Sequence, residues 1–126
     1  MNIADRVNLA IAKKHSGSNC AQSVIFAYQE DLKLNEEEIK RLGAPFGLGM
    51  GKMEGNCGAL IGAQIVKGLL SEGKPMHNEA NALLSYFGER AKAITCKELK
   101  GKDTGKVLSS CDECVEIGVR AVSEAV

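Results

Sequence analysis

Apolar residues recur at helical spacing along most of the chain, and this pattern predicts an all-α fold. The first apolar stripe, with Ile3, Val7 and Ala10, ends at a polar and glycine segment over 15–17. No alternating run typical of a strand lies between the helical segments. We therefore expect a single compact, bundle-like domain of five or six helices over residues 1–126. Its further helices are expected over 20–32, 36–42, 57–71, 77–94 and 111–125.

The segment over 57–71 is the most apolar part of the chain. Its apolar residues lie almost all round the expected helix, which is typical of a central helix. The preceding stretch over 43–55 is rich in glycine and contains Pro45, so we expect an irregular loop before the central helix. Gly58 and Gly62 lie within the central helix, where each costs about 1 kcal/mol relative to alanine. That cost favours close helix packing, with backbone approach to a bound group as the alternative.

Composition and charge exclude several classes of function. Lys+Arg and Asp+Glu stand at 16 each, so no large cationic field is available to hold nucleic acid. No apolar run approaches the roughly 18 residues that span a bilayer, and the start lacks the apolar centre of a signal peptide. We therefore expect a cytoplasmic protein with no nucleic-acid partner and no membrane insertion. A homodimer stays open, because a core this poor in aromatic residues can gain area by association.

The five cysteines are the main chemical feature of the sequence. Their odd number, in a chain expected in the cytoplasm, makes a purely structural disulfide framework a poor explanation. Thiols in a reducing compartment are usually buried small residues, metal ligands or redox-active groups. The positions of the cysteines must therefore separate these three interpretations.

Four cysteines follow a residue of the type that caps a helix N-terminus. Asn19 precedes Cys20, Asn56 precedes Cys57, Thr95 precedes Cys96 and Ser110 precedes Cys111. Three of these caps also have Gln or Glu three residues later. The first turn of a helix presents unpaired N–H groups and the positive end of the dipole, which favours an anion by about 0.3–1 kcal/mol. We therefore expect these four thiols at the first residues of helices, forming a shared thiol site with Cys114.

Cys111 and Cys114 form the most specific local motif, a Cys-x-x-Cys pair one turn apart on the last helix. Such a pair can close into a disulfide or offer two metal ligands. A zinc site of the usual spacing needs a second Cys pair or a His pair, so a metal would require Cys20, Cys57 or Cys96 as well. The lysines that precede this helix are candidates to stabilise a thiolate. They are Lys97, Lys100, Lys102 and Lys106.

The segment Cys57-Gly58-Ala59-Leu60-Ile61-Gly62 resembles the Cys-Gly-Ala-x-x-Gly motif of a bacterial family of redox-active proteins, named for its C-GCAxxG-C-C cysteine pattern. Cys20 corresponds to the family's upstream cysteine and Cys96 to its first downstream cysteine. The last one corresponds to Cys111 or Cys114. The resemblance extends from Cys20 to Val115. It implies a helical domain with thiol redox chemistry, and it supplies neither a substrate nor a cofactor.

Three functions remain open at this point. In the leading hypothesis Cys57 attacks a disulfide of a redox partner protein or of a small molecule, and Cys20, Cys96, Cys111 or Cys114 resolves the mixed disulfide. The alternative is a metal or iron–sulfur module, an electron carrier with the same five cysteines as ligands. The third is a helical interaction module whose cysteines are buried packing residues.

Overall fold

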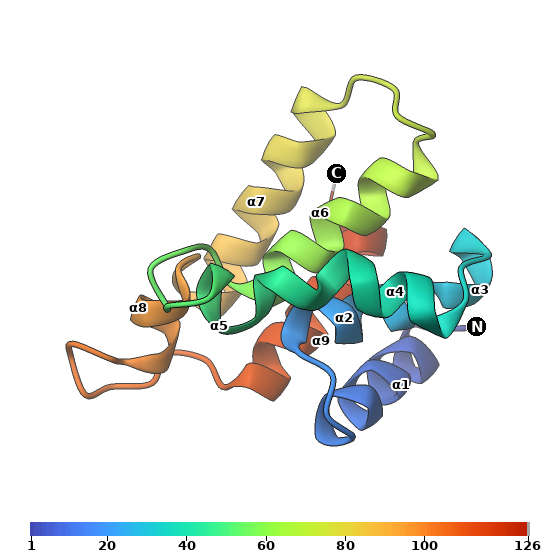
Figure 1. The fold of residues 1–126 in the computed structure, drawn as a ribbon. Helices are drawn as coiled ribbons and strands as arrows, with labels where there is room; N and C mark the ends of the chain where they lie inside the picture. Colours follow the sequence, from blue (N-terminus) through green and yellow to red (C-terminus); the bar gives the residue numbers. More distant parts are fainter. Residues whose placement is uncertain (126) are drawn as a thin grey trace.

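The computed structural model describes residues 1–125, and helices make up nearly all of their regular structure (Figure 1). The only strand-type pairing in these residues is an isolated antiparallel bridge between Asn56 and Thr95. The predicted all-α fold is therefore confirmed. The elements are α1 (Ile3–His15), α2 (Cys20–Phe26), α3 (Gln29–Leu32), α4 (Glu36–Gly43), the 3-10 helix η1 (Ala44–Phe46), α5 (Gly47–Met50), α6 (Gly58–Leu70), α7 (His77–Ala91), α8 (Cys96–Lys100) and α9 (Cys111–Glu124).

Polar caps fix where most of these helices begin. The side chain of Asn19 accepts the backbone N–H of Gln22 at 2.8 Å, and the Gln22 side chain accepts the N–H of Asn19 in return. The same reciprocal cap begins α4 at Asn35 and α9 at Ser110. Each such cap stabilises its helix by about 1 kcal/mol. The predicted helix starts at Cys20 and Cys111 are therefore confirmed.

Two predicted helices are shorter than the sequence pattern indicates. The helix expected over 20–32 divides into α2 and α3, because the backbone leaves helical geometry at Tyr28. The helix expected over 77–94 ends at Ala91, where Lys92 takes a left-handed conformation with φ 82°. In both cases the apolar spacing continues past the break, so periodicity alone does not reveal it.

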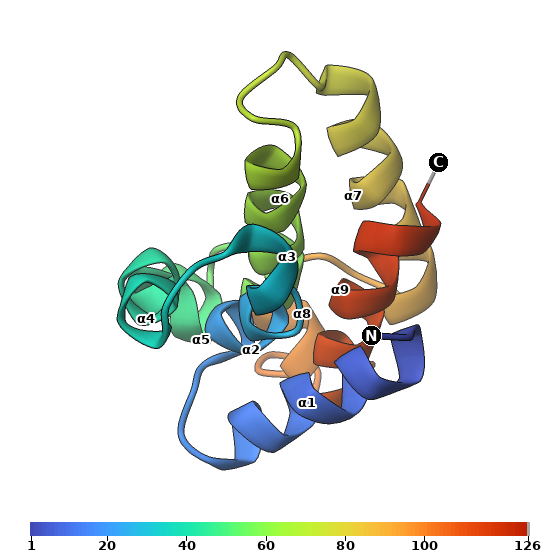
Figure 2. The same cartoon turned by 90° about the vertical axis from the view of Figure 1, so that its right-hand side faces the viewer.

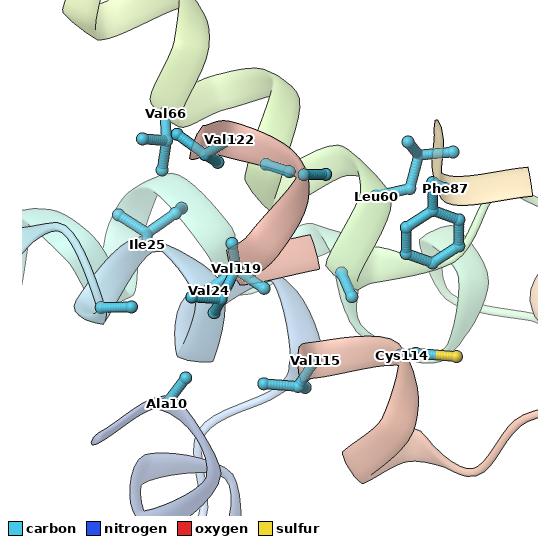
Figure 3. Close-up of a cluster of buried hydrophobic side chains, with 14 of the residues drawn as sticks. Ala10, Val24, Ile25, Leu60, Val66, Phe87, Cys114, Val115, Val119 and Val122 are labelled. Carbon is cyan, nitrogen blue, oxygen red and sulfur yellow. The ribbon is translucent and has the colours of Figure 1, made fainter. Parts of the chain in front are cut away.

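The core forms where α2, α6 and α9 meet (Figure 3). Val24 and Ile25 come from α2, Leu60 and Val66 from α6, and Val119 from α9, and all five are fully buried. Helix α2 is the most enclosed of the three, since five of its seven residues are buried, and α1, α4, α6 and α9 all pack against it. The central position predicted for 57–71 holds for the first half of α6. The helix ends with two exposed leucines, Leu69 and Leu70.

Small residues allow α2 and α6 to approach closely. A Cβ built on Gly62 would lie 2.7 Å from the carbonyl oxygen of Ala21, and one on Gly58 would lie 2.7 Å from that of Phe46. Neither contact can be relieved by a side-chain rotation, because both involve backbone atoms. Close packing is therefore the reason for these two glycines.

The glycine-rich stretch over 43–55 differs from the continuous irregular loop predicted for it. Its first part forms η1 and the distorted turn α5, in which Leu48 and Gly49 have left-handed backbone angles. Met50 and Met53 also have positive φ. Figure 1 shows this stretch beside α8, at the end of the molecule where α6 begins.

Helices α6 and α7 form an antiparallel hairpin whose turn projects away from α1 (Figure 2). Within residues 1–125, no helix combines the length and apolar character needed to cross a bilayer.

Candidate thiol site

The starts of α2, α6, α8 and α9 converge on a small pocket of about 170 Å³. Four of the five cysteines line it, each from a different helix start, so the fold brings together the four thiols that the capping pattern places at helix starts. Cys114 lies one turn deeper on α9 and is fully buried. The complete lining is Lys14, Asn19, Cys20, Leu48, Gly49, Cys57, Gly58, Cys96, Lys100 and Cys111.

The bridge between Asn56 and Thr95 joins two of the helix starts directly. The backbone N–H of Cys57 donates to the carbonyl of Ile94 at 2.7 Å, and the N–H of Cys96 donates to that of Gly55 at 3.1 Å. These hydrogen bonds fix the main chain beside both cysteines before α6 and α8 begin. Thr95 accepts the N–H of Glu98 and so caps α8, as its sequence predicts.

Cys57 itself is the N-cap residue of α6, so the prediction that Asn56 caps this helix is wrong. Asn56 is held in the bridge with Thr95, and the chain turns into the helix one residue later. The backbone N–H groups of Ala59 and Leu60 lie near the Cys57 thiol and help to lower its pKa, although the thiol makes no capping hydrogen bond. The thiol therefore lies at the positive end of the α6 dipole, which favours its ionised form.

Cys57 forms a buried pair with Cys114. The Cys114 thiol donates a hydrogen bond to the Cys57 sulfur, and this bond and the helix N–H groups lower the pKa of Cys57 to about 7 despite burial. The same hydrogen bond and burial raise the pKa of Cys114. Only 2% of Cys57 is exposed and none of Cys114. In Figure 3 the Cys114 sulfur lies at the edge of the core, on the side away from Val115.

Cys20 and Cys111 form a second pair, nearer the surface. Both are partly exposed. A hydrogen bond from the Cys20 thiol lowers the pKa of Cys111 to about 5, and the charges of Lys100 and Lys14 act in the same direction. The pKa of Cys20 is raised by this hydrogen bond and by burial. Cys111 is therefore a thiolate at neutral pH that solvent can reach.

Lys100 is the cation shared by the two pairs. Its Nζ lies 3.6 Å from the Cys114 sulfur and 3.2 Å from the carbonyl oxygen of Ser109, to which it donates a hydrogen bond. Its charge also lowers the pKa of Cys111. Of the four lysines predicted as candidates, Lys100 is the one that lines the pocket.

Lys14 is a second cation at the pocket, and the sequence analysis missed it. It lies at the end of α1, six residues before Cys20 and far in sequence from the other four cysteines. The adjacent His15 is bound to Asp112 with 2.7 Å between Nε2 and Oδ2, which ties the end of α1 to the start of α9. Its position depends on the packing of α1 against α2 and α9, and no local motif around Lys14 indicates it.

The glycine-rich stretch covers the remaining cysteine. A Cβ on Gly49 would lie 2.5 Å from the Cβ of Cys96, so only glycine allows this contact. Burial raises the pKa of Cys96, and the charge of Cys57 adds to the effect. Leu48 stands at the rim of the pocket with 62% of its surface exposed. Cys96 is therefore enclosed and its thiol is disfavoured as an anion.

The Cys-x-x-Cys motif does not pair within itself. Cys111 faces Cys20 and Cys114 faces Cys57, so each thiol of the motif has its partner on another helix. Among residues 1–125, no three side chains of His, Cys, Asp or Glu are grouped as ligands for a metal ion.

Fold and site together define a class of protein: a small all-α domain with thiols gathered at helix N-termini. Residues 18–125 match the model of the family described as "Putative redox-active protein (C_GCAxxG_C_C)", and the chain belongs to this family. The resemblance seen in the cysteine motif is thereby confirmed. No match was found among curated proteins or among solved structures.

Proposed function

We propose that this protein is a thiol–disulfide oxidoreductase in which Cys111 attacks and Cys20 resolves. The observation that carries the proposal is the Cys111 thiolate, with its pKa lowered to about 5, at a pocket open to solvent and hydrogen-bonded to a second thiol. An attacking thiolate needs both ionisation and access, and a resolving thiol must lie within reach of the first sulfur. The pair Cys20–Cys111 meets these requirements.

The reaction proceeds in two exchanges. The Cys111 sulfur attacks one sulfur of a partner's disulfide, and the S–S bond breaks so that the other partner sulfur leaves as a thiolate. The Cys20 sulfur loses its proton to solvent and attacks Cys111, releasing the second partner sulfur as a thiolate. The partner's disulfide gains two electrons, and the chain retains a Cys20–Cys111 disulfide.

The sequence hypothesis assigned the attacking role to Cys57. Cys111 is better placed than Cys57 for the external step, because Cys57 is only 2% exposed. The attacking thiolate must approach the partner's disulfide along its S–S axis, and burial of Cys57 prevents this. The substrate in this proposal is a disulfide on a partner protein or a small molecule, presented at the rim of the pocket. The size of the pocket admits a few heavy atoms around the reacting sulfur.

Stopped-flow reaction of the reduced chain with a chromogenic aromatic disulfide tests this assignment. The wild-type chain should show a fast phase that Cys111→Ser abolishes. Cys20→Ser should keep that phase and accumulate a mixed disulfide at Cys111, detected by mass spectrometry. Cys96→Ser is the matched control, since Cys96 lines the same pocket without a lowered pKa. A fast phase retained in Cys111→Ser would contradict the proposal.

A further inference from the structure

We propose that Cys57 and Cys114 are a second, internal dithiol that reduces the Cys20–Cys111 disulfide, so that one chain reduces two disulfides of its partners. This inference rests on the proposed function. It assigns the buried pair a redox role that neither the family description nor the external reaction requires. The observation behind it is the placement of the four thiols at one site: Cys20, Cys57 and Cys111 line one pocket, and Cys114 lies one helical turn from Cys111 on α9.

Helix α9 holds the two pairs in register. Cys111 and Cys114 are one turn apart on it, and each faces a cysteine from a different helix. The thiols opposite them are close to one another as well, since Cys20 and Cys57 line the same pocket and the charge of Cys57 acts on Cys20. The four sulfurs therefore form a continuous path from the surface to the core.

The inner pair has no direct access for a partner. Cys114 is fully buried and is absent from the pocket lining, and Cys57 is 2% exposed. A disulfide brought by another molecule meets Cys111 and Cys20 first, because both are partly exposed. Electrons from the inner pair must therefore pass through the outer pair.

The exchange between the pairs is balanced in electrons and protons. Once Cys20–Cys111 is a disulfide, the Cys57 thiolate attacks the Cys20 sulfur, and Cys111 leaves as a thiolate. Cys114 then gives up its proton and attacks Cys57, which frees Cys20 to take up that proton. Two electrons move outward, Cys57–Cys114 becomes the disulfide, and the outer pair is ready for a second turnover.

Cys96 stays outside this exchange. Its thiol is enclosed against Gly49, and no hydrogen bond joins it to another cysteine in the part of the chain that the structure describes. Four of the five thiols should therefore be oxidised, and Cys96 should remain as the single free thiol.

Oxidation of the reduced chain with excess oxidised glutathione, followed by acid quenching, alkylation and tryptic mapping, tests the inference. Cys111 and Cys114 share one tryptic peptide, over 107–120. The doubly oxidised chain should yield this peptide linked to both 15–33, which carries Cys20, and 53–67, which carries Cys57. Fragmentation distinguishes the two sulfurs of the shared peptide. The Cys96→Ser control should give the same three-peptide species.

The rate at which each disulfide forms tests the relay. In the double variant Cys20→Ser, Cys111→Ser, we expect Cys57–Cys114 to form at least about tenfold more slowly than in the wild-type chain, because the inner pair has lost its route to the oxidant. An unchanged rate would overturn the relay. A wild-type chain that forms Cys20–Cys111 and leaves the inner thiols reduced would also overturn it, with the proposed function intact. A chain that forms no Cys20–Cys111 disulfide would overturn both.

Discussion

The Nζ of Lys100, the last residue of α8, lies 3.6 Å from the sulfur of Cys114. The contact places a half-buried positive charge between the inner and outer thiol pairs. It exists because α8 ends at Lys100 and the following loop returns so that Ser109 accepts a hydrogen bond from the same amine. The charge state of the thiols therefore depends on a lysine outside the cysteine motif.

Replacing Lys100 should raise the pKa of Cys111. In the wild-type chain, alkylation of Cys111 by iodoacetamide should fall as the pH drops through about 5, where the thiolate takes up a proton. In Lys100→Met this half-point should move to higher pH, because a favourable charge is lost. Alkylation of the 107–120 peptide over pH 4–9 measures it. Lys102→Met removes an exposed lysine of the same loop and leaves the 107–120 peptide intact, and an equal shift in that control would refute the role of Lys100.

Ionisation of Cys111 should also make the protein more stable as the pH rises. The folded chain lowers the pKa of Cys111 from its ordinary value of 9.0 to about 5. Between these values the unfolded chain binds a proton that the folded chain does not, so stability increases with pH over that window and is lost below about 5. Urea unfolding in reductant should show the difference in free energy between wild type and Cys111→Ser growing from pH 5.5 to pH 8.5. A constant difference would contradict the lowered pKa.

The approach of α2 to α6 predicts opposite effects of alanine at two glycines of one helix. Gly62→Ala should destabilise the fold by about 1–3 kcal/mol, because the new methyl group meets the backbone of Ala21. Gly68→Ala should stabilise it by up to about 1 kcal/mol, since nothing lies within 4 Å of its added Cβ and alanine favours the helix. Urea midpoints of the two variants test this, and equal effects would mean that α2 and α6 do not touch at Gly62.

Two substitutions in the turn over the pocket should also have opposite effects on stability. Leu48 is exposed and left-handed, with φ 54°, so Leu48→Gly should stabilise the chain by about 1 kcal/mol. Gly49→Ala should destabilise it, since its added Cβ would meet Cys96 in a backbone conformation that disfavours alanine. Thermal unfolding measures both. A Cys96 thiol that reacts faster in Gly49→Ala would show that this turn is what encloses it.

Elemental analysis separates thiol exchange from the metal and iron–sulfur alternative. Protein purified without oxygen and without chelator should carry iron and zinc well below one atom per chain, and its thiols should react fully with a disulfide reagent after unfolding. A stoichiometric metal, or visible absorption from a cluster, would instead make the cysteines at the pocket its ligands.

The sequence predicts the helix starts that carry the thiols, because capping involves neighbouring residues. It does not predict the contacts between residues that are distant in the chain. The caps at Asn19, Thr95 and Ser110 are read correctly because each involves atoms only a few residues apart. The cap at Asn56 is misread because a bridge to Thr95, distant in sequence, engages that residue.

The pairing of the thiols also depends on contacts between residues that are distant in sequence. Spacing on α9 predicts that Cys111 and Cys114 share a face, and the fold separates their partners by packing α2 against one and α6 against the other. Lys14 enters the site because α1 packs against α2 and α9. These features depend on how the helices pack, and the spacing of residues along the sequence does not predict that packing.

The bridge between Asn56 and Thr95 closes residues 57–94 into a loop whose two ends are fastened beside the thiols. The turn over 71–76 is the far point of that loop (Figure 1). Insertions there are held apart from the site by the length of α6. An affinity tag inserted after Gly73, which has open space around it and is itself kept, would anchor the chain for partner capture without touching the thiols.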